Sequence, residues 1–131
     1  MECCLFVYGT LKRRQKNHSH LSGAEFISEG TLTGPFRMYE EPFGNYPIVV
    51  SSGSGRQKIF GEVYRITNRS LLRSLDDFED VPLLYRRVIV LIRLRCQSAF
   101  PCYLRCFMYL SDLVQSFPEH GPFIESGCCS E

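Results

Sequence analysis

Four carboxylates lie within five positions at the end of a short predicted helix. They are Asp76, Asp77, Glu79 and Asp80. Carboxylates held close together raise one another's pKa, and negative charge near the C-terminus of a helix meets an unfavourable dipole. A carboxylate perturbed in this way could take up and release protons during a reaction. Ion pairing with Arg86 or Arg87 explains the cluster equally well, and the residues alone leave both interpretations open.

The second candidate is the opening strand, residues 5–8, which stops at Gly9-Thr10 and runs into a basic cluster. Because Gly9 has no Cβ, a ligand can approach its backbone closely, and successive N–H groups in such a turn suit an anion. An ordinary turn is the simpler interpretation of this spacing. The cations of the cluster are Lys12, Arg13, Arg14 and Lys16. They are typical of a solvated loop or, weakly, of a localisation signal, and they could also attract an acidic substrate.

The histidines and cysteines indicate little further chemistry. His18 and His20 have no acidic third ligand nearby, so we expect no metal site. Cys102 and Cys106 would share one face of a strand about 13 Å apart, which is too far for a disulfide. The seven cysteines include no C-x-x-C spacing and make a poor disulfide or zinc framework, so we expect reduced thiols.

Length and charge restrict the class of protein. The 131 residues fit a single domain, residues 1–131, and the formal net charge is +1. Nucleic-acid binding would need a strong basic excess on one face, so it is not expected. No apolar run approaches the roughly 20 residues that span a bilayer, and no signal peptide is recognisable. These features predict a cytoplasmic protein with no nucleic acid, membrane or obligate protein partner.

Hydrophobic patterning predicts the elements that must position these candidates. Strand-like segments cover residues 5–8, 25–39, 47–51, 58–66, 85–95 and 102–110. A helix is expected over residues 70–78, where apolar side chains share one face and Asn68 or Thr67 could cap the start. A short helical turn is expected near residues 112–117. The fold class is therefore α+β, a small, mostly antiparallel β-barrel or curled sheet with one or two flanking helices.

Three separated segments, FVYGTLKRRQKNH, GEVYRI and LDDFEDVPLLYRR, resemble the γ-glutamylcyclotransferase superfamily, and its γ-glutamylamine cyclotransferase branch most closely. The resemblance implies a small β-barrel with flanking helices that uses no cofactor and no metal. It also implies that Tyr8, Gly9, Thr10 and Leu11 form a loop whose backbone holds the γ-glutamyl part of a small-molecule substrate. In the same way, it implies that Glu79 is the catalytic acid and base.

The reaction that this resemblance implies uses no water. The α-amine of the γ-glutamyl group attacks its own γ-carbonyl, closes the ring of 5-oxoproline and expels an amine such as lysine. The ammonium must lose a proton before it can attack. A Glu79 that is desolvated and crowded by other carboxylates would have a raised pKa and would be a suitable base. Because the attack is intramolecular, positioning supplies much of the rate.

The chain departs from the family pattern in two places. Arg14 stands where the family usually has glycine, and the stretch around residues 38–47 aligns poorly, although Tyr46-Pro47 corresponds to a Tyr-Pro of the family. Substrate preference is expected to depend on such variable parts. The alternative hypothesis is therefore a non-catalytic or differently specific small-molecule binding module on the same barrel fold.

Overall fold

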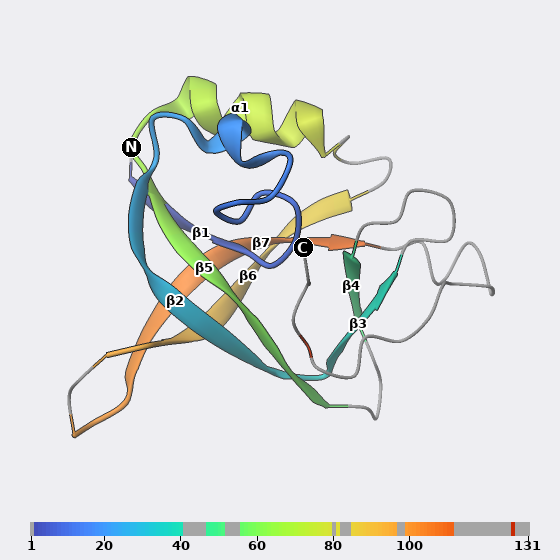
Figure 1. Ribbon diagram of the computed structural model, residues 1–131, viewed down its shortest axis with the longest axis vertical. Helices are drawn as coiled ribbons and strands as arrows, with labels where there is room; N and C mark the ends of the chain where they lie inside the picture. The colour runs from blue at the N-terminus through green and yellow to red at the C-terminus, as the bar shows by residue number, and fades with distance from the viewer. Residues whose placement is uncertain are drawn as a thin grey trace.

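A computed structural model describes residues 2–40, 47–51, 56–79, 81, 85–96, 99–111 and 127. Within these residues the chain forms a closed five-stranded barrel, a separate two-stranded sheet, one α-helix and one short 3-10 helix (Figure 1). The barrel strands are β1 Cys3–Val7, β2 Glu25–Gly34, β5 Gln57–Ile66, β6 Tyr85–Leu94 and β7 Cys102–Ser111. The remaining elements are η1 His18–Leu21, β3 Phe36–Glu40, β4 Pro47–Ser51 and α1 Arg69–Phe78. The predicted α+β barrel with flanking helices is confirmed.

The barrel closes because its first strand contacts its last. The strand order is β1-β5-β2-β6-β7, and β1 pairs in parallel with β7 at Leu5 and Phe107, whereas the other barrel pairs are antiparallel. Gly61 of β5 permits a close approach to β1, since a Cβ at this position would lie 2.2 Å from the carbonyl oxygen of Val7. The segment over residues 25–39, predicted as one or two bent strands, is two strands, β2 and β3, separated at Pro35, which has no N–H for a sheet ladder.

The core has two parts, and β1 contributes to both. Leu5 and Val7 belong to a cluster that packs under α1 and includes Leu72 and Leu75, whereas Phe6 belongs to a second cluster within the barrel. All three β1 side chains are almost fully buried. Because alternate side chains of a strand point to opposite faces, both clusters hold β1 in place. The loop that follows β1 and contains Gly9 therefore begins at a firmly packed strand end.

Helix α1 lies across one end of the barrel (Figure 1). The side chain of Asn68 caps its start, with the Ser70 N–H donating to Oδ1 over 2.8 Å, as the sequence predicted. The helix ends at Phe78, and the N–H of Glu79 donates to the carbonyl of Leu75 over 2.9 Å. This last bond fixes the point from which the Glu79 side chain leaves the helix. The helical turn expected near residues 112–117 lies outside the described residues.

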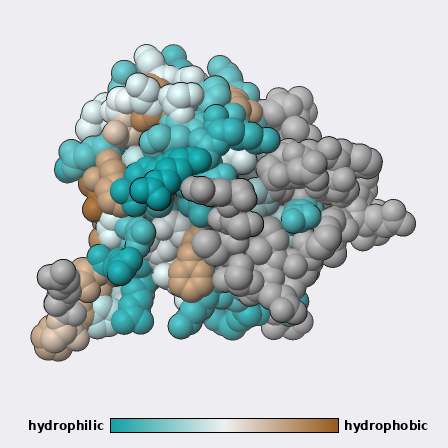
Figure 2. Space-filling view, in the orientation of Figure 1, coloured by the Kyte–Doolittle hydropathy of each residue, from teal (hydrophilic) through white to brown (hydrophobic). Residues whose placement is uncertain are grey.

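The surface gives two further facts about the part of the chain that the structure describes. None of its helices is long and apolar enough to cross a membrane, and it contains no group of three or more His, Cys, Asp or Glu side chains arranged to hold a metal ion. Hydrophilic side chains cover much of the described face in Figure 2, whereas hydrophobic ones show at the tip of the β6–β7 hairpin.

Candidate active site

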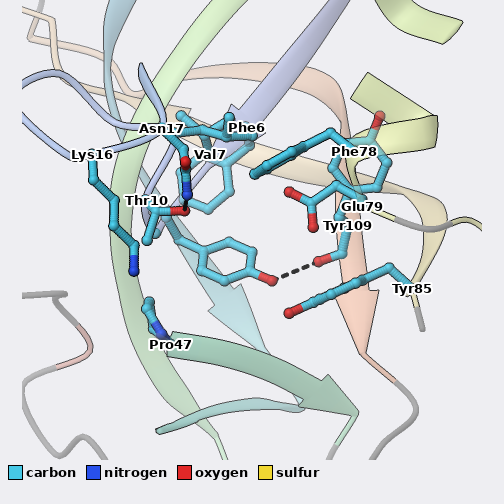
Figure 3. A pocket seen from close by; sticks show the side chains of 13 residues that line it. Phe6, Val7, Thr10, Lys16, Asn17, Pro47, Phe78, Glu79, Tyr85 and Tyr109 are labelled. Atoms are coloured by element: carbon cyan, nitrogen blue, oxygen red, sulfur yellow. Dashed lines mark hydrogen bonds between the residues drawn. The ribbon is translucent and has the colours of Figure 1, made fainter. Parts of the chain in front are cut away.

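A cavity of about 370 Å³ opens where the end of β1 and the loop after it face the end of α1 and the start of β6. Aromatic rings form much of its wall, and carboxylate, hydroxyl, amide and ammonium groups lie among them (Figure 3). A largely apolar cleft with a few polar groups is the usual form of a small-molecule site. Its lining residues are Phe6, Val7, Tyr8, Gly9, Thr10, Leu11, Lys16, Asn17, Pro47, Phe78, Glu79, Tyr85 and Tyr109.

Glu79 is the acidic residue that lines the cavity among the described residues. Figure 3 shows its carboxylate pointing into the cavity from the end of α1, close to Phe78 and Tyr109. Burial removes water from this carboxylate and raises its pKa from 4.5 to about 7. Desolvation and crowding by the neighbouring carboxylates were both expected to raise this pKa, and desolvation is the cause that the structure gives. Near neutral pH, Glu79 can therefore both accept and donate a proton.

The carboxylates of the acidic cluster have different surroundings, and Asp76 pairs with other side chains. Its Oδ1 accepts a hydrogen bond from the Tyr109 hydroxyl over 2.7 Å and lies 3.3 Å from Nε of Arg87. The ion pair with Arg87 confirms the second interpretation of the cluster for Asp76, whereas Asp77 is exposed. Among the described members of the cluster only Glu79 lines the cavity, and Asp80 lies outside the described residues. The two interpretations therefore apply to different residues.

Tyrosine side chains fix the wall on the β7 side. The Tyr8 hydroxyl donates to the backbone carbonyl of Tyr109 over 2.7 Å (Figure 3). Burial, and secondarily the hydrogen bond to Asp76, raises the pKa of the Tyr109 hydroxyl well above its usual value, so this group stays neutral. Tyr8 therefore ties the end of β1 to β7, and Tyr109 in turn ties β7 to α1.

The loop after β1 is held by its own hydrogen bonds. The Lys12 N–H donates to the Gly9 carbonyl over 3.1 Å, and the Asn17 N–H donates to the Thr10 carbonyl over 3.0 Å. The Asn17 side-chain amide also donates to the Thr10 hydroxyl over 3.0 Å. At the end of the loop, a ring nitrogen of His18 lies 2.8 Å from the Leu11 carbonyl. These contacts give residues 9–11 one defined backbone path along the cavity.

The basic cluster in this loop does not behave as a uniform solvated patch. Arg13 is bound to Glu62 of β5 through both its backbone N–H, over 2.8 Å, and its side-chain Nε, over 3.1 Å. Lys16 lines the cavity. Arg14 is exposed, does not line the cavity, and has a φ of 69°, a left-handed backbone conformation that favours glycine. This conformation accounts for the glycine that the family usually has at this place.

The structure brings all five residues that the sequence singled out into one cavity, namely Tyr8, Gly9, Thr10, Leu11 and Glu79. Of the remaining lining residues, the sequence pointed to Lys16, as part of the basic cluster, and left most of the others unnoticed. Tyr85 and Tyr109 look like ordinary strand residues in the sequence, and Asn17 carries no motif of its own. Pro47 was noted as part of Tyr46-Pro47, of which Tyr46 lies outside the described residues.

Gly9 is packed against another wall residue, which makes it a sensitive position. A Cβ at residue 9 would lie 3.0 Å from Cγ of Pro47. Gly9→Ala is therefore expected to shift the loop or Pro47 by a few tenths of an ångström and to lower kcat/KM about tenfold. Gly34→Ala is the matched control, because its Cβ would lie 3.3 Å from Phe36, which does not line the cavity. Equal losses in both variants would contradict a specific role for Gly9.

A small closed barrel whose cavity joins a desolvated glutamate to a glycine turn has the form of a small-molecule enzyme. The chain belongs to the family described as gamma-glutamyl cyclotransferase, AIG2-like, which matches residues 5–128. It is 38% identical over 118 residues to the gamma-glutamylaminecyclotransferase of Homo sapiens, covering 80% of this chain and 76% of the relative. It is 30% identical over 126 residues to the enzyme of the same name from Bos taurus, covering 92% and 73%. A crystal structure of an AIG2-like protein from Mus musculus superposes with a TM-score of 0.79 at 30% identity, covering 95% of this chain and 87% of the other.

Proposed function

We propose that this enzyme is a cofactor-free γ-glutamylamine cyclotransferase in which Glu79 transfers the protons. The α-amine of the γ-glutamyl group attacks the γ-carbonyl carbon, and the bond between that carbon and the amine nitrogen breaks. The products are 5-oxoproline and a free amine such as lysine. The observation that carries the proposal is a desolvated carboxylate with a pKa of about 7 in the same cavity as the Gly9 turn.

Glu79 is suited to both halves of this proton transfer. The attacking amine enters as an ammonium whose pKa lies above neutral pH, so a base is needed to free its lone pair. A carboxylate with a pKa of about 7 is a far better base for that proton than an ordinary glutamate. Once protonated, the same group can give the proton to the nitrogen of the departing amine. The attacking nitrogen loses a second proton when the ring closes, and Glu79 can pass this proton to the same amine, which leaves as an ammonium. No proton has to leave the cavity during the cycle.

The loop of residues 8–11 supplies the positioning. Gly9, Thr10 and Leu11 line the cavity, and their backbone path is fixed by the hydrogen bonds to Lys12, Asn17 and His18. Backbone N–H groups held in this way can bind a carboxylate or the oxyanion that develops on the γ-carbonyl. Because the nucleophile and the electrophile belong to one molecule, holding the folded-back conformation supplies much of the acceleration.

Lys16 supports a substrate that carries a carboxylate. It lines the cavity on the side opposite to Glu79 (Figure 3). A γ-glutamylamine presents an α-ammonium and an α-carboxylate on its glutamyl end, so a site with one acid and one base matches its charges. An uncharged amide without these groups would match neither of them.

The direct test is incubation of the purified protein with ε-(γ-glutamyl)-lysine, γ-glutamyl-alanine and glutathione, followed by detection of 5-oxoproline by mass. We expect 5-oxoproline and lysine in equal amounts from the first compound. If γ-glutamyl-alanine gives the product instead, the enzyme is specific for γ-glutamyl peptides rather than γ-glutamylamines. Silence from all three compounds would contradict the proposed function.

A further inference from the structure

Glu62 is a buried carboxylate that the proposed reaction does not use. It lies on β5, is 8% exposed and does not line the cavity that holds Glu79. Its Oε1 accepts hydrogen bonds from the Arg13 N–H, over 2.8 Å, and from the Tyr64 hydroxyl, over 3.1 Å. Its Oε2 accepts from Arg13 Nε over 3.1 Å. A carboxylate is rarely buried unless it is paired and hydrogen-bonded, and here the partner belongs to the substrate loop.

The Arg13 side chain, which pairs with Glu62, is also held by an aromatic ring. Its guanidinium carbon lies 4.0 Å from the ring centroid of Phe26 on β2, which places the cation over an aromatic face. The two contacts act together on the loop: the side-chain ion pair holds Arg13 against the barrel wall, and the backbone N–H contact fixes the main chain two residues after Leu11. The loop is thus attached to the barrel wall between Gly9 and Asn17, the two ends of its internal hydrogen bonds.

We infer that Glu62 is a positioning residue for catalysis: through Arg13 it sets the place of the Gly9–Leu11 backbone relative to Glu79. This inference rests on the proposed function. Displacement of a substrate-holding group by about 1 Å can lower a rate about 100-fold. Loss of the contact should therefore reduce turnover even where the barrel remains folded.

Glu29 provides a matched control for Glu62. The two glutamates lie directly opposite each other on β2 and β5, and both face the Arg13 guanidinium. Glu29 is exposed and lies 3.9 Å from Arg13 Nη2, with no contact to the loop backbone. Glu62→Gln and Glu29→Gln therefore remove the same charge at neighbouring places, and only the first disturbs the loop.

The test measures kcat and KM on ε-(γ-glutamyl)-lysine, together with Tm, for both variants and for Arg13→Ala and Arg13→Lys. We expect Glu62→Gln and Arg13→Ala to lower kcat/KM at least about tenfold, Glu29→Gln to stay within about twofold, and Arg13→Lys to recover part of the loss. Wild-type kcat/KM in Glu62→Gln or Arg13→Ala would overturn the inference, whatever the Tm. If Glu62→Gln does not fold, kcat/KM of Arg13→Ala tests the inference instead, because Arg13 is exposed and its replacement should leave the barrel folded. Absence of turnover in the wild type would instead refute the proposed function.

A second, independent observation concerns two cysteines at the far end of the barrel. Cys96 follows β6 by two residues, and Cys102 begins β7 opposite Leu94, so both flank the tip of one hairpin. Their sulfur atoms lie 2.9 Å apart. Cys96 is exposed and Cys102 is partly exposed. The hairpin end projects away from α1 in Figure 1, and its tip carries the hydrophobic side chains seen in Figure 2.

We propose that Cys96 and Cys102 form a reversible disulfide with small disulfide oxidants. The thiolate of Cys96, the more exposed of the two, attacks one sulfur of the oxidant and releases one small thiol. The Cys102 sulfur then attacks the Cys96 sulfur of the mixed disulfide and releases the second thiol. The protein loses two protons and two electrons, and the oxidant is reduced to two thiols. Only a small side-chain movement is needed, because the sulfurs are already in contact.

Cys106 shows why the other described thiol of β7 should not take part. It is 2% exposed, and burial raises the pKa of its thiol to about 12, so it is protonated at neutral pH and out of reach. The contrast between one buried thiol and two touching, accessible thiols within ten residues gives the test an internal control.

The test equilibrates the full chain with reduced and oxidised glutathione, alkylates the remaining thiols and digests with trypsin. Cleavage after Arg95 and Arg105 releases residues 96–105, which contain Cys96 and Cys102 and no other cysteine. We expect this peptide to lose two hydrogens and to escape alkylation, and the oxidised protein to unfold about 5 °C higher. Cys106→Ser should leave the bridge intact, whereas Cys96→Ser should yield only a mixed disulfide at Cys102 or a free thiol. A wild-type peptide that is doubly alkylated or doubly glutathionylated at every ratio would overturn the proposal.

Discussion

Glu79→Gln is expected to lower kcat on ε-(γ-glutamyl)-lysine by at least about 1,000-fold while the affinity for the substrate changes little. The glutamine amide has the size and shape of the carboxylate but cannot accept the ammonium proton. The substitution removes the charge that faces the substrate ammonium but leaves the loop of residues 8–11 and Lys16 in place, so binding should fall far less than turnover. Kinetics measure the first effect, and calorimetric titration of the inactive variant measures the second.

Asp77→Asn is the control for this variant. Asp77 lies two residues earlier at the same helix end but is exposed and does not line the cavity. Its replacement removes one negative charge from the same region and should change kcat less than about twofold. Substantial turnover by Glu79→Gln, or an equal loss in Asp77→Asn, would remove Glu79 from the proton-transfer role.

The second large effect concerns stability, and it needs no substrate. Burial raises the pKa of Glu79 to about 7 in the folded protein, against an ordinary value of 4.5 in the unfolded chain. A group whose pKa is raised by folding supports the folded state fully below its unfolded pKa and loses that contribution as the pH rises through its folded pKa. Ionised Glu79 therefore destabilises the wild type progressively between about pH 4.5 and pH 7.

Glu79→Gln removes this penalty because an amide does not ionise. We expect the variant to gain free energy of unfolding relative to the wild type as the pH rises, reaching on the order of 2 kcal/mol above pH 7 after allowance for partial exposure. Denaturant unfolding at about pH 5 and pH 8 measures the difference, with Asp77→Asn as the control that should show no such gain. A constant offset at both pH values would mean that Glu79 is not desolvated. A variant that is more stable yet inactive is the usual mark of an active-site residue.

Much of the fold could be predicted because its signals are local. Alternating apolar and polar residues indicate the long strands. The helical spacing of Leu72 and Leu75 indicates α1, and Asn68 indicates where it starts. The break between β2 and β3 at Pro35 was the least certain boundary, since the residues on both sides favour strands. Closure of the barrel through β1 and β7 could not be derived locally, because it joins Leu5 to Phe107 across almost the whole chain.

The candidate site was predicted only in part, for a physical reason. Glu79 and Gly9 were singled out by a resemblance, and their meeting in one cavity depends on how α1 lies across the barrel end. Desolvation of Glu79 was expected, but so was crowding by the neighbouring carboxylates, and sequence proximity of carboxylates says nothing about their directions. Asp76 turns to Tyr109 and Arg87, whereas Glu79 turns into the cavity.

The role of the basic loop was the least predictable feature. Nothing in KRRQK distinguishes Arg13, which binds Glu62, from Arg14, which is exposed. A weak signal did exist on the other partner: a glutamate within the apolar strand KIFGEVYRI must be paired if it is buried. Its partner lies 49 residues away, so only the closed barrel identifies it.

The pH dependence of kcat/KM on ε-(γ-glutamyl)-lysine tests the central claim most directly, because this quantity reports the ionisations of the free enzyme and the free substrate. The reactive pair is an ionised Glu79 and a substrate ammonium. We expect kcat/KM to rise tenfold per pH unit, to level off near pH 7, where Glu79 titrates, and to fall again at higher pH, where the substrate ammonium deprotonates. A profile that is already level at pH 5, or that shows no ionisation near 7, would contradict proton transfer by a desolvated Glu79.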